Sequence, residues 1–149
     1  MTDEKRLEIV NEAKSWVGTP YVGWSALKGS KGGTDCGQLI KAVYQKCGVV
    51  PQGDLGIDPC YSLQVAQHLA DPTYLSIIET YMKEISVDEV KPGDVVAFKL
   101  GHAFAHAGIV IEYPTFIHAM GHGGVRFSNV STHPKLRKAS HRFYTIKDV

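Results

Sequence analysis

The spacing of apolar residues changes once along this chain of 149 residues, and that change constrains its fold most strongly. In the first third, apolar side chains recur at the i, i+3, i+4, i+7 spacing of amphipathic helices, which predicts helices over 3–17 and 36–47. After a turn signal at 91–94, apolar and polar residues alternate as in strands. We expect strands over 95–100, 106–112, 115–120, 124–130 and 141–147. Helices followed by a strand meander predict an α+β fold, with helices packed on one face of a central antiparallel sheet.

The segments between these elements are expected to connect them within one domain, residues 1–149. Residues 19–35 mix aromatic residues with glycine, serine and lysine and predict a loop beside a site. Residues 49–60 predict a connection, 62–70 a third helix that ends at Asp71-Pro72, and 73–85 a further helix.

Composition excludes several classes of function. Hydrophobic residues make up 44% and charged residues 21% of the chain, as in soluble globular domains. The net charge of +1 argues against nucleic acid or an anionic membrane as partner, and the basic residues near the end are expected on a solvated surface. The N-terminus carries no signal peptide, and no stretch is long enough to insert in a membrane, so we expect a protein that is cytoplasmic as synthesised.

The chain has three cysteines, and an odd, small number predicts no disulfide framework. Cys47 closes the apolar stripe of the second helix and is expected in the core, while Cys60 falls in a polar connection and is given no role. Cys36 follows a tight polar turn and is expected in the first helical turn, where free N–H groups and the helix dipole favour an anion. The thiol should therefore ionise more easily and act as a nucleophile, although a buried cysteine can also be a small core residue.

Two histidines lie on strands that are expected to be neighbours. A hairpin turn at 112–114 would place Gly108 opposite His118, so that His106 and His118 are diagonal neighbours on one face, about 7–8 Å apart at the backbone. This arrangement requires an odd-length turn, because a two-residue loop would put them on opposite faces.

If the helix of Cys36 packs on that face, the chemistry of a cysteine–histidine enzyme follows. Cys36 is then the nucleophile, and His106 takes its proton and later protonates the leaving amine. His118 fixes the tautomer of His106, and the N–H of Cys36 contributes to an oxyanion hole. Gly108 leaves room between the imidazoles, whereas Asp35 disfavours the thiolate.

A metal site is a weaker interpretation. His102 and His106 have the H-x-x-x-H spacing that binds zinc on a helix, but four residues of strand span roughly 13 Å, too far to share one ion. We therefore expect neither a metal nor another cofactor. The remaining histidines, His68, His122, His133 and His141, are expected as surface or satisfied polar residues, with His122 close enough to the site to contact a substrate.

An ordered set of short motifs covers most of the chain except roughly residues 49 to 87. The motifs are Ala13-Lys14-Ser15-Trp16-Val17-Gly18-Thr19-Pro20-Tyr21-Val22, Gly33-Thr34-Asp35-Cys36, Val90-Lys91-Pro92-Gly93-Asp94-Val95-Val96-Ala97-Phe98, His106-Ala107-Gly108-Ile109-Val110 and Phe116-Ile117-His118-Ala119. Together they resemble the NlpC/P60 family of papain-like cysteine peptidases. The resemblance implies the papain-like NlpC/P60 fold and a catalytic triad. Its members would be Cys36, His106 and His118, with Tyr21, Asp35 and Gly37 beside the substrate or the oxyanion, while Trp24 is expected to pack.

The same resemblance implies a substrate. Members of the family cut stem peptides of bacterial peptidoglycan, often at the γ-D-glutamyl bond to a diamino acid. The chain departs from the common pattern at Cys36-Gly37-Gln38 and Tyr21-Val22-Gly23-Trp24-Ser25, where substrate would be held, which leaves the bond open. Its compact form resembles members encoded with phage tail genes. A phage tail, a secretion machine that delivers the protein to the cell wall, and a cytoplasmic role in recycling wall peptides all fit.

Two alternatives stay open at this stage. One is a thiol amidase or acyltransferase that acts on another amide or ester with the same architecture. The other is a binding or structural tail module with an inactive centre, against which the intact Cys36, His106 and His118 count.

Overall fold

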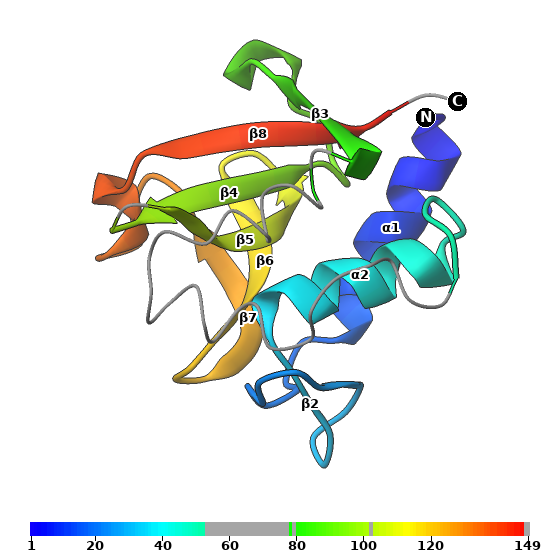
Figure 1. Cartoon of the computed structure of the whole chain (residues 1–149), viewed down its shortest axis with the longest axis vertical. Helices are drawn as coiled ribbons and strands as arrows, with labels where there is room; N and C mark the ends of the chain where they lie inside the picture. Colours follow the sequence, from blue (N-terminus) through cyan, green and yellow to red (C-terminus); the bar gives the residue numbers. More distant parts are fainter. Residues whose placement is uncertain (53–77, 79, 102, 148–149) are drawn as a thin grey trace.

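Helices on one side and a twisted sheet on the other make up this fold (Figure 1). The computed structural model describes residues 1–52, 78, 80–101 and 103–147. Within these residues, helices α1 (Asp3–Ser15) and α2 (Cys36–Lys46) pack together against one face of the sheet. The apolar stripe of α2 is buried, as its spacing predicts, and Gly48 follows the helix with a positive φ of 73°.

The described strands form a six-stranded antiparallel sheet in the order β3-β8-β4-β5-β6-β7. Its strands are β3 (Met82–Ile85), β4 (Val95–Leu100), β5 (Ala103–Glu112), β6 (Thr115–Met120), β7 (Gly124–Asn129) and β8 (His141–Ile146). Two short 3₁₀ helices, at Val87–Glu89 and Leu136–Lys138, lie in the connections. The α+β architecture predicted from the change of period is confirmed.

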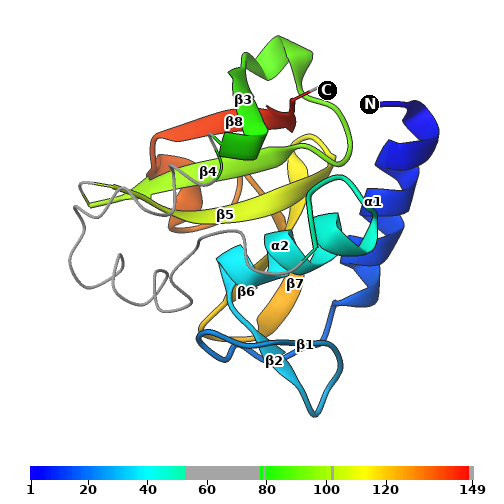
Figure 2. The same ribbon diagram turned by 45° about the vertical axis from the view of Figure 1, so that its right-hand side comes forward.

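The connecting segments differ in part from those expected. The helix expected over 73–85 is wrong at its end, because residues 82–85 pair with β8 as strand β3; residues 78, 80 and 81 are helical, and 73–77 and 79 lie outside the described residues. The loop expected over 19–35 contains a short hairpin, β1 (Ala26–Leu27) and β2 (Gly33–Thr34), which lies next to the start of α2 (Figure 2). The expected helix over 62–70 and Cys60 lie outside the described residues.

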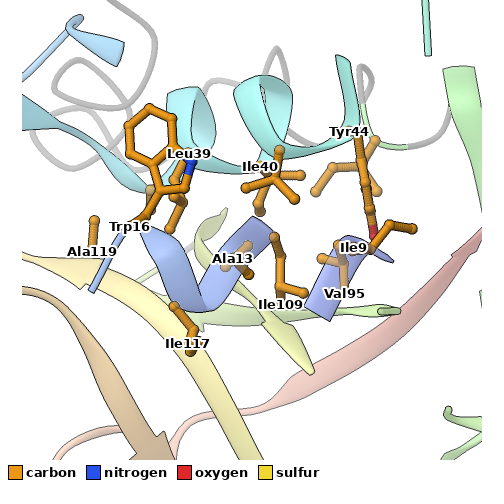
Figure 3. Close-up of a cluster of buried hydrophobic side chains, with 14 of the residues drawn as sticks. Ile9, Ala13, Trp16, Leu39, Ile40, Tyr44, Val95, Ile109, Ile117 and Ala119 are labelled. Carbon is orange, nitrogen blue, oxygen red and sulfur yellow. The ribbon is translucent and has the colours of Figure 1, made fainter. Parts of the chain in front are cut away.

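Each face of the sheet has its own apolar core. Side chains of α1 and α2 pack on one face against Val95, Ile109 and Ile117 (Figure 3). On the opposite face, Phe98 and Phe116 form a second cluster. Successive residues of a strand therefore contact different cores, which decides where each side chain of β5 and β6 points.

The β5–β6 hairpin has the predicted register for a different reason. Only residues 113 and 114, which are joined by a cis peptide bond, form its turn. A two-residue turn on its own would place His106 and His118 on opposite faces of the sheet. The pairing shifts at the adjoining Ile111, which is left as a one-residue bulge and restores the odd count. Ile109 then pairs with Ile117, and the same register sets Gly108 opposite His118.

Among the described residues, no helix has the length and apolar character needed to cross a membrane.

Candidate active site

Cys36 is the first residue of α2, as predicted, because Asp35 caps the helix. The Asp35 backbone is extended, and its carboxylate accepts the N–H of Gln38 at 2.8 Å. The second carboxylate oxygen accepts the N–H of Trp24 at 2.7 Å. Asp35 is fully buried, so one carboxylate fixes both the start of the helix and the loop beside it.

That loop runs along the residues that precede Cys36. Val22 donates its N–H to the carbonyl of Thr34 at 3.1 Å, and Thr34 donates to the carbonyl of Pro20 at 3.0 Å. Tyr21 therefore forms a bridge with Thr34, two residues before Cys36, and its side chain packs partly buried against the helix-side core. Trp24 has a left-handed φ of 68° and is half exposed, so the packing expected of it is incomplete.

His106 and His118 form a buried, hydrogen-bonded pair. His106 Nε2 lies 2.7 Å from His118 Nδ1, and the ring centroids are 5.0 Å apart. The chain of contacts continues on β7, where His118 Nε2 lies 2.7 Å from Ser128 Oγ. A Cβ on Gly108 would come within 2.6 Å of the carbonyl oxygen of Ile117, so only glycine permits this approach of β6.

The helix does not pack on the face that carries the histidines. His106 and His118 lie against Phe98 and Phe116, on the face away from the helices, whereas Ala107 and its alternate neighbours face α2. The arrangement assumed from the sequence is wrong in this respect. Successive side chains of a strand point to opposite faces, and α2 packs on the face of Ala107 and Ile109, so the His106 side chain points to the other face.

The sulfur nevertheless reaches β5, through the strand's backbone. The backbone N–H of Ala107, the residue after His106, is near enough to the Cys36 sulfur to lower the pKa of the thiol. Val110 donates its N–H to the carbonyl of Asp94, on the β4 side of β5, and because N–H groups alternate sides along a strand, the N–H of Ala107 points toward β6. The pairing of β5 with β6 covers only Ile109 to Glu112, and the thiol therefore binds β5 where the two strands part.

Burial keeps both the Cys36 thiol and the His106 ring neutral at pH 7. It raises the pKa of the Cys36 thiol to about 12, with a further contribution from the Asp35 carboxylate, and the N–H groups of Ala107, Gly37 and Cys36 only partly offset this. The expectation of an easily ionised thiol is therefore wrong for the free protein. Burial likewise lowers the pKa of His106 to about 4, helped by the positive charges of His133 and Lys135.

Two residues near the site were missed by sequence reasoning. Ser128 carried no motif, although β6–β7 pairing sets Arg126 opposite His118 and so places Ser128 diagonally on the same face. The ring of His133, expected only as a surface or satisfied polar residue, lies 5.8 Å from that of His118. His122 is exposed in the turn before β7. No cluster of three or more metal-ligating side chains occurs among the described residues, which exclude His102.

Known proteins share this fold. The domain of the peptidoglycan hydrolase SagA aligns over 96% of this chain and 98% of its own, with a TM-score of 0.60 and 23% identity. The peptidoglycan hydrolase RipB from Mycobacterium tuberculosis aligns over 98% of this chain and 66% of its own, with a TM-score of 0.63 and 18% identity. NlpC1 from Trichomonas vaginalis aligns over 97% of this chain and 46% of its own, with a TM-score of 0.66 and 17% identity.

A sequence relative points the same way. A probable endopeptidase from Haemophilus influenzae is 26% identical over 126 residues, which is 83% of this chain and 64% of that protein, so the chain spans less than two thirds of its length. The sequence model of the NlpC/P60 family matches residues 18–142, which include Cys36, His106 and His118. The order of motifs, the fold and this match agree, and the chain belongs to the NlpC/P60 family.

Proposed function

We propose that this chain is a cysteine peptidase or amidase that hydrolyses peptide bonds in the stem peptides of peptidoglycan. The observation that carries the proposal is that the Cys36 thiol and the His106 ring lie at neighbouring residues of β5. The backbone N–H of Ala107 lies near the Cys36 thiol and lowers its pKa, and the adjoining His106 is hydrogen-bonded to His118. The names of the relatives, a probable endopeptidase and two peptidoglycan hydrolases, support the substrate class.

The proposed reaction begins from neutral groups. The Cys36 sulfur attacks the carbonyl carbon of the scissile bond while its proton passes to His106, which becomes an imidazolium. The N–H groups of Cys36 and Gly37, at the start of α2, stabilise the oxyanion. His106 then protonates the leaving amine, and a thioester remains on Cys36. Water attacks the thioester after giving a proton to His106, and that proton returns to the sulfur as the acid leaves.

His118 orients the base in this scheme. When His106 is an imidazolium, both of its ring nitrogens carry protons, and the Nε2–H donates to His118 Nδ1 across 2.7 Å. The pair is enclosed by Phe98 and Phe116, so water competes little for this bond. His118 therefore acts as the third, orienting member of the triad.

The substrate is proposed to reach Cys36 along the loop of residues 20–24. Tyr21 and the half-exposed Trp24 are held beside the start of α2 by Thr34 and Asp35, which makes them candidates for substrate contact. Both oxygens of the Asp35 carboxylate already accept N–H groups, so its direct contact with substrate stays a prediction. The γ-D-glutamyl bond to a diamino acid is the proposed point of cleavage.

Mass spectrometry of muropeptide digests tests the proposal, because the mass change identifies the bond. We expect turnover by the wild type and by Cys47→Ala, a matched control at a cysteine that is also 3% exposed, and none by Cys36→Ala. Cleavage at another amide, or binding without cleavage by the wild type and Cys36→Ala alike, would contradict it. The second result would favour a binding module instead.

A further inference from the structure

We propose that Ser128 is a positioning residue, whose hydroxyl oxygen holds His118 in the one tautomer that lets His106 accept the proton of Cys36. Ser128 Oγ lies 2.7 Å from His118 Nε2, and His118 Nδ1 lies 2.7 Å from His106 Nε2. The three side chains thus form one continuous chain of hydrogen bonds across β5, β6 and β7. This inference rests on the proposed function.

The direction of the hydrogen bonds follows from the reaction. A base must offer a bare nitrogen to the thiol, so the neutral His106 carries its proton on Nε2 and donates it to His118 Nδ1. His118 must then carry its own proton on Nε2, and Ser128 Oγ is the acceptor within reach. In the opposite direction, the proton of His106 would sit on Nδ1, and the ring could not accept another from Cys36.

The burial of His118 makes the Ser128 hydroxyl necessary as an acceptor for its Nε2–H. The His118 side chain is fully buried, and an N–H without an acceptor in such a place is costly. Without the hydroxyl, the His118 proton is better placed on Nδ1, where it donates to His106 Nε2. That shift converts the base into a donor toward the thiol.

The charged groups around His118 are consistent with a neutral ring in this position. Burial, together with the charges of His106, His133 and Arg126, lowers the pKa of His118 to about 2. His133 accepts the N–H groups of Lys135 and Leu136 at its Nδ1, so the proton of its neutral ring is on Nε2.

Nitrogen-15 NMR of the histidine side chains tests the tautomer without any assumption about substrate. We expect the wild-type His118 to carry its proton on Nε2 at pH 7, and Ser128→Ala to move it wholly or partly to Nδ1. Ser128→Thr keeps a hydroxyl and should restore the wild-type tautomer, while Ser131→Ala, at an exposed serine three residues on, should leave it unchanged. A wild-type His118 protonated on Nδ1 would overturn the proposal even if Ser128→Ala failed to fold.

Kinetics supply the second readout. Ser128→Ala should lower kcat for muropeptide cleavage about 3- to 10-fold with little change in KM, and Ser128→Thr should recover most of it. An unchanged kcat in Ser128→Ala would refute the role of Ser128 while leaving the peptidase intact. If the wild type cleaves nothing, the proposed function fails, and the NMR result alone decides whether Ser128 sets the tautomer.

Discussion

As the pH falls, this fold should be destabilised first by protonation of its two buried histidines, His106 and His118, at a pH above that at which its carboxylates are protonated. Burial lowers the pKa of His106 from its usual 6.5 to about 4, and that of His118 to about 2. The unfolded chain therefore binds protons first as the pH falls. The free energy of unfolding is therefore at its full value above pH 6.5. Each histidine lowers it as the pH falls from 6.5 to the pKa of that histidine in the folded state.

The magnitude follows from these values. At pH 5, the difference between a pKa of 6.5 and one of about 4 costs about 2 kcal/mol per histidine, because one pKa unit corresponds to about 1.4 kcal/mol. Two such rings cost about 4 kcal/mol, a large part of the 5–15 kcal/mol that holds a typical domain folded. A carboxyl with a lowered pKa, such as that of Glu89, acts only below its usual 4.5.

Urea denaturation at pH 7 and pH 5 measures this loss. The wild type should lose about 4 kcal/mol of unfolding free energy, and His118→Asn about half of that, because asparagine still accepts the Nε2–H of His106 but does not titrate. His122→Gln changes an exposed histidine and should lose as much as the wild type. Equal losses in the wild type and His118→Asn would refute the reasoning, whatever their absolute stabilities.

Two further substitutions test the local structure of the site. Asp35→Asn keeps a helix cap but removes the charge beside the thiol and an acceptor for Trp24, so the protein should melt lower while iodoacetamide labels Cys36 faster at neutral pH. A labelling rate equal to that of the wild type would contradict this, as judged by mass spectrometry of the labelled peptide. Gly108→Ala should cost about 1–3 kcal/mol and most of the activity, because its Cβ would meet a β6 carbonyl oxygen at 2.6 Å. Gly121→Ala meets nothing within 4 Å and is its control in thermal unfolding; equal melting temperatures would argue against the clash.

Elements whose burial repeats at a local period were predictable from the sequence. The stripe of α2 expresses burial against one large neighbour, and the pairing of His106 with His118 agrees with the predicted register, although a bulge rather than a three-residue turn supplies it. Strand β3 was missed because its four residues are held at the sheet's edge by β8, about sixty residues further along the chain. Ordinary helical spacing just before it gave no sign of that partner.

The face on which α2 packs could not be read from β5. Both sets of alternate residues on this strand are apolar or buried, since Ala107 and Ile109 face the helices while His106 and Val110 face the second core. A strand buried on both sides carries no polar face to orient it. The bulge at Ile111 was also hidden, because nothing in a two-residue turn indicates an extra residue beside it.

The ionisation of Cys36 was misjudged because a local effect was weighed without a tertiary one. A helix N-terminus stabilises a charge by about 0.3–1 kcal/mol at an exposed position. The rise of the thiol pKa from 9 to about 12 corresponds to about 4 kcal/mol in the opposite direction, and it comes mainly from burial by the sheet, with Asp35 adding to it. Burial therefore prevails, and the free protein holds a neutral thiol, which resists oxidation better than a thiolate would. In the proposed mechanism, Cys36 therefore reacts only when a base takes its proton, so its reactivity would depend on the tautomer that His106 holds.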